Sequence, residues 1–220
     1  QDTTDFMENT LQVWEELGFT FDAISTGFIV SERQANRIAA YCQKQRAAGT
    51  QIFVDPIMGD EGHLYNGLTD ETVKEMRKLI AQADYMVPNY TEAALLTGTA
   101  YEEKGTSKAE IQELLQKLHA ISGGSVVITS AKVDGADVVA GYDAKKKSYF
   151  LLPFDLIPVR FPGTGDIFSS IFMGDVLLGK DMEDATVKAM QAVREMILRN
   201  MDNQDTFKGI PIETCLEVID

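Results

Sequence analysis

The sequence contains the stretch Phe161-Pro162-Gly163-Thr164-Gly165-Asp166, followed directly by a mostly apolar run over residues 167–173. The apolar run predicts a helix, and the two glycines predict a turn where that helix begins. Glycine lets backbone N–H groups approach a ligand closely, and the first turn of a helix leaves several N–H groups without carbonyl partners. With the positive end of the helix dipole, these groups predict an anion site suited to phosphate.

Asp166 would stand beside such an anion, in the first turn of the helix. An acid at this place fits a base that takes the proton from a hydroxyl group as the hydroxyl oxygen attacks a phosphate. The hexapeptide is also typical of a plain glycine turn before a helix with a charged first turn. Taken alone, it favours that structural interpretation, so the rest of the chain has to decide.

Length and composition are those of an ordinary soluble globular protein. The 220 residues fit one domain over 1–220, with 45% hydrophobic and 25% charged residues. The formal net charge of −14 and the lack of a basic stripe argue against nucleic acid or an anionic membrane as partner. The apolar runs are too short for a membrane span, no signal peptide is expected, and Cys42 and Cys215 lack a metal or redox spacing. We therefore expect a cytoplasmic protein.

Strand and helix patterns alternate along most of the chain. Buried-strand patterns cover residues 21–25, 52–54, 85–87 and 125–128, and amphipathic helices are expected over 4–17, 31–48, from 69, from 90 to 98, from 107 and over 183–201. Ser31 with Gln34 and Ser107 with Glu110 are predicted capping boxes. Residues 58–63 are expected to be a loop, residues 136–142 and 148–152 a hairpin, and the tail from 210 either a strand or a short helix.

This alternation predicts an α/β fold, namely a three-layer α-β-α sandwich around a mostly parallel sheet, with the hairpin at one edge. In such sheets ligands bind beyond the carboxyl ends of the strands. The four predicted strands end in small or polar groups: Ser25-Thr26-Gly27, Asp55-Pro56, Pro88-Asn89 and Thr129-Ser130. Their convergence with the glycine turn favours a functional interpretation of all five features.

An acidic protein that binds a polyphosphate needs a cation such as Mg²⁺, held by carboxylates directly or through water. Asp55, Asp60 and Glu92 are the candidates, with Asn89 as a neutral partner. Asp60 also fits a turn-stabilising role and Glu92 a helix-start charge, whereas an unpaired Asp55 at the end of a buried strand would be costly.

Thr129 and Ser130 either donate hydroxyl groups to phosphate oxygens or cap the next turn. Together with Asp166 and the N–H groups of Gly163 to Asp166, these residues complete the set that phosphoryl transfer requires. His63 and His119 have no partner at metal-ligand spacing, and three lysines at 145–147 are typical of a solvated turn.

These segments resemble the ribokinase-like superfamily and, within it, the vitamin B6 (pyridoxal/pyridoxamine) kinases. The resemblance rests on residues 55–60, 88–98, 128–130 and 163–166, whose order and spacing match over about residues 20 to 200. The Gly-Thr-Gly-Asp element is typical of the superfamily, and the Asp-Pro-x-Met-Gly-Asp and Thr-Gly-Phe segments are typical of the vitamin kinases. The related hydroxymethylpyrimidine kinases usually carry Cys where Asp166 stands.

The resemblance implies MgATP-dependent phosphorylation of the 5′-hydroxymethyl group of a B6 vitamer. It assigns Asp166 as the base and as a substrate contact, and Gly163, Thr164 and Gly165 as the anion hole. It assigns Asp55 and Glu92 to the metal, and Asp60, Asn89, Thr129, Ser130, Val159 and Phe161 to ATP. Phe28 stands where such kinases often carry Tyr against the vitamin ring. Mg²⁺ is the implied cofactor, and a monovalent-cation requirement stays open.

Kinases of this kind are commonly homodimers, and they begin with about two further strands, a helix and a flap before the first helix of this chain. The sequence therefore resembles the C-terminal three-quarters of such an enzyme, and we expect an exposed apolar sheet edge and little activity if those segments are lacking. Two alternatives stay open: a hydroxymethylpyrimidine or other small-molecule kinase of the superfamily, and a non-catalytic ligand-binding relative.

Overall fold

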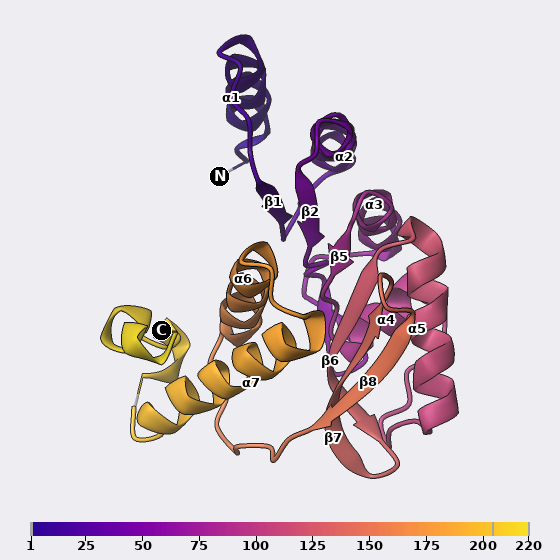
Figure 1. Ribbon diagram of the computed structural model, residues 1–220, viewed down its shortest axis with the longest axis vertical. Helices are drawn as coiled ribbons and strands as arrows, with labels where there is room; N and C mark the ends of the chain where they lie inside the picture. Colours follow the sequence, from indigo (N-terminus) through magenta and orange to yellow (C-terminus); the bar gives the residue numbers. More distant parts are fainter. Residues whose placement is uncertain (1, 204, 220) are drawn as a thin grey trace. The chain divides into compact units, whose positions relative to one another are not determined.

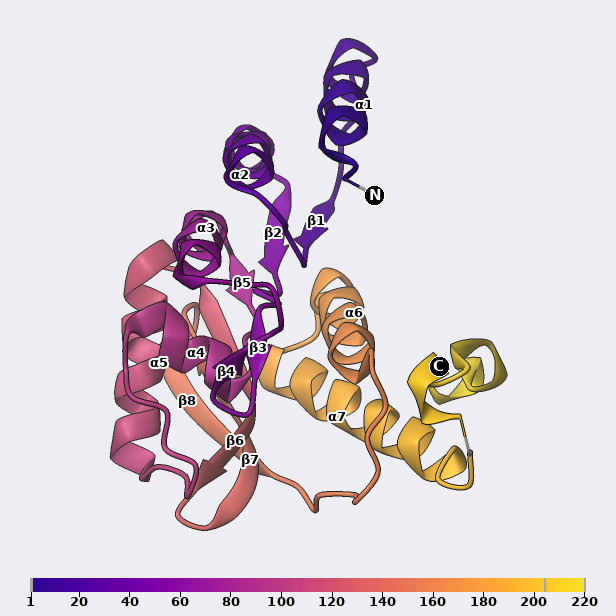
Figure 2. The same ribbon diagram turned by 180° about the vertical axis from the view of Figure 1, so that it is seen from behind.

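The computed structural model describes residues 2–203 and 205–219, which divide into two compact units. Unit 1 extends to Leu151 and contains the sheet, whereas unit 2 begins at Leu152 and contains a helix pair. Figures 1 and 2 label the α-helices and strands of both units. The expectation of one domain over residues 1–220 stays a prediction.

Unit 1 is built on a six-stranded sheet in which neighbouring strands follow the order β1-β2-β5-β6-β7-β8 (Figure 1). The pairs β1–β2, β2–β5 and β5–β6 are parallel, and β6–β7 is antiparallel. The α/β class with a mostly parallel sheet and an edge hairpin is thereby confirmed. The strands are β1 (Ala23–Thr26), β2 (Gln51–Val54), β5 (Tyr85–Met86), β6 (Ser125–Val133), β7 (Ala136–Asp143) and β8 (Ser148–Pro153).

The described residues of unit 1 form five helices, and all five were expected from the sequence. They are α1 (Thr4–Glu16), α2 (Glu32–Ala47), α3 (Asp70–Ile80), α4 (Tyr90–Thr97) and α5 (Lys108–Ser122). The capping box of Ser107 and Glu110 is present at the start of α5. The capping box predicted for Ser31 and Gln34 is only half present. The Ser31 hydroxyl oxygen accepts the Gln34 N–H group, but the Gln34 side chain donates to Thr4 and accepts the Val30 N–H group instead of the Ser31 N–H group.

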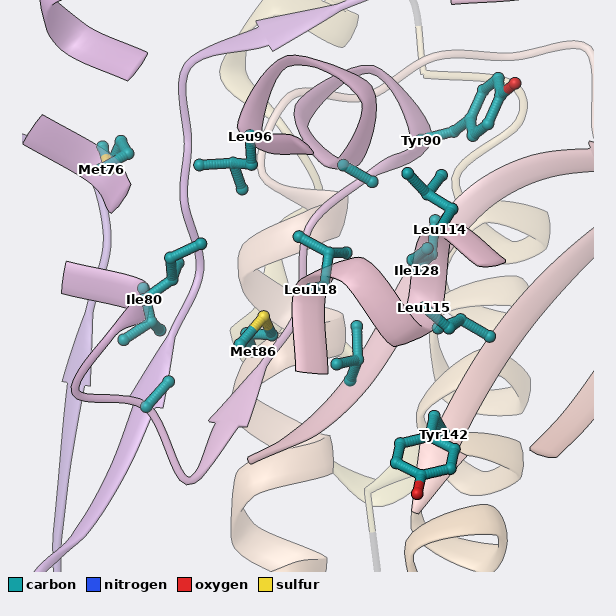
Figure 3. Packing of buried hydrophobic residues seen from close by; sticks show 14 of the residues in the cluster. Met76, Ile80, Met86, Tyr90, Leu96, Leu114, Leu115, Leu118, Ile128 and Tyr142 are labelled. Atoms are coloured by element: carbon teal, nitrogen blue, oxygen red, sulfur yellow. The ribbon is translucent and has the colours of Figure 1, made fainter. Parts of the chain in front are cut away.

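The core of unit 1 lies where α3, α4 and α5 pack on the strands (Figure 3). Ile80 of α3, Leu96 of α4 and Leu118 of α5 are almost fully buried, and so are Met86 of β5 and Ile128 of β6. Because β5 and β6 are covered in this way, they read as apolar runs rather than as alternating patterns. Along the chain, the buried residues Met86 and Ile128 are thus followed closely by the polar candidates Asn89 and Thr129.

The segment 58–63, which the sequence indicated as a loop, is a small antiparallel hairpin. Its strands are β3 (Gly59–Asp60) and β4 (His63–Leu64), joined by Glu61 and Gly62. Both joining residues have left-handed φ angles, 51° and 81°, as a two-residue hairpin turn requires. Strands of two residues are too short to produce an alternating pattern, so the expectation of a loop was wrong.

The strand predicted over 125–128 is also longer than expected, because β6 continues to Val133 beyond an irregularity between Ile128 and Ala131. A two-residue turn at Asp134 and Gly135, with φ angles of 50° and 88°, then leads into β7. Residues 125–143 thus form one long hairpin of β6 and β7, whereas the sequence predicted only the pairing of β7 with β8.

Unit 2 consists of α6 (Thr164–Leu177), α7 (Met182–Arg199) and a tail of short turns. Phe172 of α6 and Ala185, Ala189 and Met196 of α7 are buried, so the two helices share an apolar interface. The tail resolves into three 3-10 helices: η1 (Thr206–Lys208), η2 (Ile212–Thr214) and η3 (Leu216–Val218). Among the helices of the described residues, none combines the length and the apolar character that a membrane crossing requires.

Candidate functional site

The carboxyl ends of β2 and β5 lie beside the middle of β6 in unit 1. Asp55 follows β2, Asn89 follows β5, and Thr129 lies within β6, directly after Ile128. The Thr129 N–H group donates to the Pro88 carbonyl oxygen at 2.9 Å, and Asn89 and Thr129 form a parallel bridge. The Asp55 N–H group donates to the carbonyl oxygen of Thr26, at the end of β1, at 2.9 Å. The predicted convergence of these strand ends at one edge of the sheet is confirmed within unit 1.

Hydrogen bonds of the Asn89 and Glu92 side chains connect the first turn of α4 to the β3–β4 hairpin and to Met58, which precedes it. Asn89 accepts the Glu92 N–H group at 2.9 Å and donates from Nδ2 to the Gly59 carbonyl oxygen at 2.7 Å. The Glu92 carboxylate accepts the N–H groups of Met58 at 3.0 Å and Asn89 at 2.8 Å. Both side chains therefore hold the backbone that carries Asp60, in addition to any contact with a ligand.

Glu92 is 3% exposed, and its environment disfavours the ionised form. Burial raises the pKa of Glu92 to about 8, and the charge of Asp55 adds to this rise, against the opposing N–H donors of Asn89, Met58 and Gly59. Glu92 is buried and Asp55 is half-buried, and a cation beside these two carboxyl groups would favour their ionised forms. The pair Asp55 and Glu92 thus fits a metal site.

Asp60 is exposed on β3, where its Oδ1 atom accepts the Glu61 N–H group at 2.9 Å. Within residues 2–203 and 205–219, no group of three or more His, Cys, Asp or Glu side chains has an arrangement that could hold a metal ion. A magnesium ion here would therefore have few protein ligands and would complete its shell with water and phosphate oxygens, as is usual for Mg²⁺.

Thr129 and Ser130 lie at the irregularity of β6. Ser130 has a left-handed φ of 56°, which a residue other than glycine seldom adopts. Ser130 is exposed and Thr129 is half-buried. Bulges change the direction of side chains next to functional sites, and backbone strain of this kind gathers at ligand sites. The geometry therefore favours a ligand-facing role for Ser130 over a turn-capping role alone.

The predicted anion hole lies in unit 2, at the start of α6. Gly163 is the N-cap residue with a left-handed φ of 87°, and its carbonyl oxygen accepts the Ile167 N–H group at 3.0 Å. A Cβ atom added at Gly165 would meet no atom within 4 Å, so the backbone of the first turn is open to a ligand. Asp166 is exposed in this turn. The arrangement can bind an anion beside a carboxylate.

The remaining candidates differ in exposure. Phe28, which follows β1, is 53% exposed, and Val159 is half-buried, whereas Phe161 is 4% exposed. Of the two histidines, His119 has a structural environment, since its Nδ1 lies 2.8 Å from the Gly124 carbonyl oxygen and its ring packs against Tyr142. Because Phe28 is exposed, its ring can lie against a flat ligand ring, whereas the ring of Phe161 packs mainly against protein atoms.

Sequence reasoning missed Thr91 and Tyr101. Thr91 lies between Asn89 and Glu92 in α4 and accepts the Gly62 N–H group at 2.9 Å. Tyr101 packs its ring against Gly62. The signal that could have indicated Thr91 is its place between two candidate residues in the first turn of a short helix.

A parallel sheet with an edge hairpin, polar strand ends and a glycine turn before a helix defines an α/β protein of the ribokinase-like class. The chain belongs to the phosphomethylpyrimidine kinase family, whose model matches residues 3–210.

Curated relatives of the chain are named pyridoxal kinases rather than phosphomethylpyrimidine kinases. The pyridoxal kinase of Arabidopsis thaliana is 29% identical over 203 residues, which is 89% of this chain and 64% of the relative, and pyridoxal kinase PdxY of Rubrobacter xylanophilus is 26% identical over 185 residues, 80% of this chain and 62% of the relative. The chain thus spans slightly less than two thirds of the length of these relatives.

Solved structures agree with the fold. A Bacteroides thetaiotaomicron protein provisionally named a phosphomethylpyrimidine kinase, in a crystal form with pyridoxal, is 32% identical with a TM-score of 0.94 and covers 100% of this chain and 78% of that one. The pyridoxal kinase of Lactobacillus plantarum is 27% identical with a TM-score of 0.88, over 100% of this chain and 78% of that one. The ribokinase-like fold is thereby confirmed.

Proposed function

We propose that this chain carries the catalytic residues of an ATP-dependent kinase that phosphorylates the 5′-hydroxymethyl group of pyridoxal, pyridoxamine or pyridoxine. The observation that carries the proposal is Asp166, exposed in the first turn of a helix whose backbone is open to an anion. Relatives named pyridoxal kinase and a similar structure crystallised with pyridoxal support this choice of substrate.

In the proposed reaction, Asp166 accepts the proton of the 5′-hydroxyl group while the hydroxyl oxygen forms a bond to the γ-phosphorus of ATP. The bond between the γ-phosphorus and the β–γ bridging oxygen breaks, ADP leaves with that electron pair, and Asp166 later releases its proton to water. The N–H groups of Gly163, Thr164 and Gly165 hold the negative charge that develops on the transferred group.

Unit 1 contributes the phosphate and metal contacts. Asp55 would hold Mg²⁺ directly or through water, with Glu92 beside it, and the bound ion supplies charge neutralisation. Asn89, Thr129 and Ser130 contact ATP phosphates, Asp60 contacts them through the metal ion, and Phe28 faces the vitamin ring. In unit 2, Val159 and Phe161 border the adenine. The proposal includes a homodimer in the cytoplasm and leaves a monovalent cation as a variable to test.

Turnover with MgATP and a panel of pyridoxal, pyridoxamine, pyridoxine, hydroxymethylpyrimidine and ribose tests the proposal. Asp166→Asn is expected to lower kcat by about 10²–10³-fold or more and to leave MgATP affinity within a few-fold. Asp184→Asn is the matched control, because Asp184 is an exposed acid in the first turn of α7. An Asp166→Asn protein that retains most of its turnover would refute the role of Asp166.

A second candidate is a hydroxymethylpyrimidine kinase, which the name of the matched family favours. The carboxylate of Asp166 argues for the vitamin B6 substrates, because the sequence resemblance places Cys at this position in most hydroxymethylpyrimidine kinases. A kcat/KM that is higher for hydroxymethylpyrimidine than for every B6 vitamer would decide for the second candidate. Ligand binding without turnover on any substrate would indicate a non-catalytic relative.

A further inference from the structure

The tip of the β3–β4 hairpin has a backbone conformation that needs support. Glu61 and Gly62, which join Asp60 to His63, both have left-handed φ angles, 51° and 81°. A turn of this kind favours Asn, Asp or Gly at both places, so glutamate at the first place is unfavourable. The conformation must be stabilised by contacts from outside the hairpin.

Thr91 and Tyr101 supply these contacts. The Thr91 hydroxyl oxygen accepts the Gly62 N–H group at 2.9 Å, and the Thr91 side chain is buried, with 3% of the residue exposed. The Tyr101 ring covers Gly62 so closely that an added Cβ atom would lie 2.7 Å from Tyr101 Cδ1. Tyr101 is itself supported by the ring of Tyr90, with centroids 5.3 Å apart.

Tyr101 also lies close enough to Asp60 to respond to its charge. Burial raises the pKa of Tyr101, the charges of Asp60, Glu103 and Glu61 add to that rise, and a hydrogen bond with Thr91 opposes it. With Asn89 bound to Gly59 and Glu92 bound to Met58, the first turn of α4 therefore holds the hairpin at its base and at its tip.

We propose that Thr91, backed by Tyr101, is a positioning residue that holds the Asp60 carboxylate at the place where MgATP binds. The inference rests on the proposed function, in which Asp60 contacts the ATP phosphates. Thr91 acts only through the hairpin: it fixes Gly62, Gly62 fixes the turn, and the turn fixes Asp60. Loss of this anchor is expected to weaken MgATP binding and to leave the chemical step nearly unchanged.

The test compares Thr91→Val with Thr91→Ser and Thr97→Val. Thr91→Val keeps the shape and removes the acceptor of the Gly62 N–H group, whereas Thr91→Ser keeps the hydroxyl group. Thr97→Val is the matched control, because the hydrogen bonds of the Thr97 hydroxyl group stay local. Its acceptors are two carbonyl oxygens of α4, at 2.8 Å and 3.2 Å, and the Thr99 hydroxyl oxygen at 2.9 Å. The measurements are amide hydrogen exchange at Gly62, MgATP affinity by calorimetry, and kcat.

For Thr91→Val we expect faster exchange at Gly62, a Kd for MgATP that is about 5–10-fold higher and a kcat within about twofold of the parent, as the loss of one hydrogen bond implies. Thr91→Ser and Thr97→Val should match the parent within about twofold. An unchanged Kd in Thr91→Val, or an equal loss in Thr97→Val, overturns the inference.

If Thr91→Val does not fold, Gly62→Ala decides, because it displaces the tip from the side of Tyr101 and should raise the Kd by at least as much. An unchanged Kd in folded Gly62→Ala overturns the inference. Failure of the parent protein to bind MgATP is a separate result: it refutes the proposed function, and this inference with it. Binding by the parent with no effect of the variants refutes the positioning role alone.

Discussion

Glu92 makes stability depend on pH in a way that the structure defines. Its carboxyl group is buried between β3 and α4, where burial raises the pKa from 4.5 to about 8. The folded protein therefore holds a proton on Glu92 that the unfolded chain has lost at neutral pH. Removing the ionisable group by Glu92→Gln tests this directly.

The stabilising contribution of Glu92 is complete below pH 4.5 and is lost as the pH rises through about 8. Because one pKa unit corresponds to about 1.4 kcal/mol, the free energy of unfolding should fall between pH 5 and pH 8 by on the order of 4 kcal/mol from this group. Glu92→Gln should remove that slope. At pH 5 the variant should be less stable by about 1–3 kcal/mol, because its amide NH₂ group cannot accept one of the backbone N–H groups.

The assay is urea unfolding at pH 5, 6, 7 and 8 without divalent cations, followed by far-UV circular dichroism. The stability gap between parent and Glu92→Gln should close or reverse by pH 8. Glu110→Gln is the matched control: Glu110 has the same capping-box place in α5, but it is exposed, and hydrogen bonds from Ser107 lower its pKa. The stabilising effect of Glu110 is lost only as the pH falls through the acid range. The difference in unfolding free energy between the parent and Glu110→Gln should therefore stay constant from pH 5 to 8. Parallel curves for the parent and Glu92→Gln would refute the reasoning.

One labelling experiment and two substitutions test other parts of the structure. Burial raises the pKa of the Cys42 thiol to about 11, so a thiol reagent at pH 8 should label Cys42 only after unfolding. Peptide mapping locates the label, and rapid labelling of Cys42 in the native protein would contradict this prediction. Gly141→Ala should destabilise the protein by about 1–3 kcal/mol or prevent folding, because the added Cβ atom would lie 2.0 Å from Phe150 Cζ; a melting temperature equal to that of the parent would show that the ring moves aside. Gly163→Ala should cost about 1–2 kcal/mol at a left-handed φ of 87° and lower turnover, and a fully active, equally stable variant would exclude the need for glycine there.

Local signals in the sequence were sufficient for most elements of the fold. The capping box of Ser107 and Glu110 marks the start of α5, and Gly98 marks the end of α4, because these motifs act over three or four residues. Gln34 shows the limit. Its amide was expected to cap its own helix, but Thr4 lies near it in the folded chain and competes for the side chain.

The sequence predicted only part of the candidate site, because some of its contacts are tertiary. The rule for strand ends brought Asp55, Asn89 and Thr129 to one edge, because parallel strands end on the same side. The hydrogen bonds of Glu92 to Met58 and of Thr91 to Gly62 join segments about thirty residues apart, and no local pattern encodes such contacts. The sequence therefore indicated which residues gather at the edge, and tertiary contacts determined which of them support the others.

The long β6–β7 hairpin has a consequence for the order of folding. Its strands are joined by two residues, so their contacts are local and should form within microseconds, whereas β1, β2 and β5 pair in parallel across intervening helices and must close longer loops. β5 has only two residues and lies between β2 and β6. On the ribosome, β1, β2 and β5 emerge before the hairpin that completes their sheet. We expect the nascent chain to expose the apolar strands β2 and β5 until residue 143 has emerged from the ribosome. A chaperone would bind during this interval.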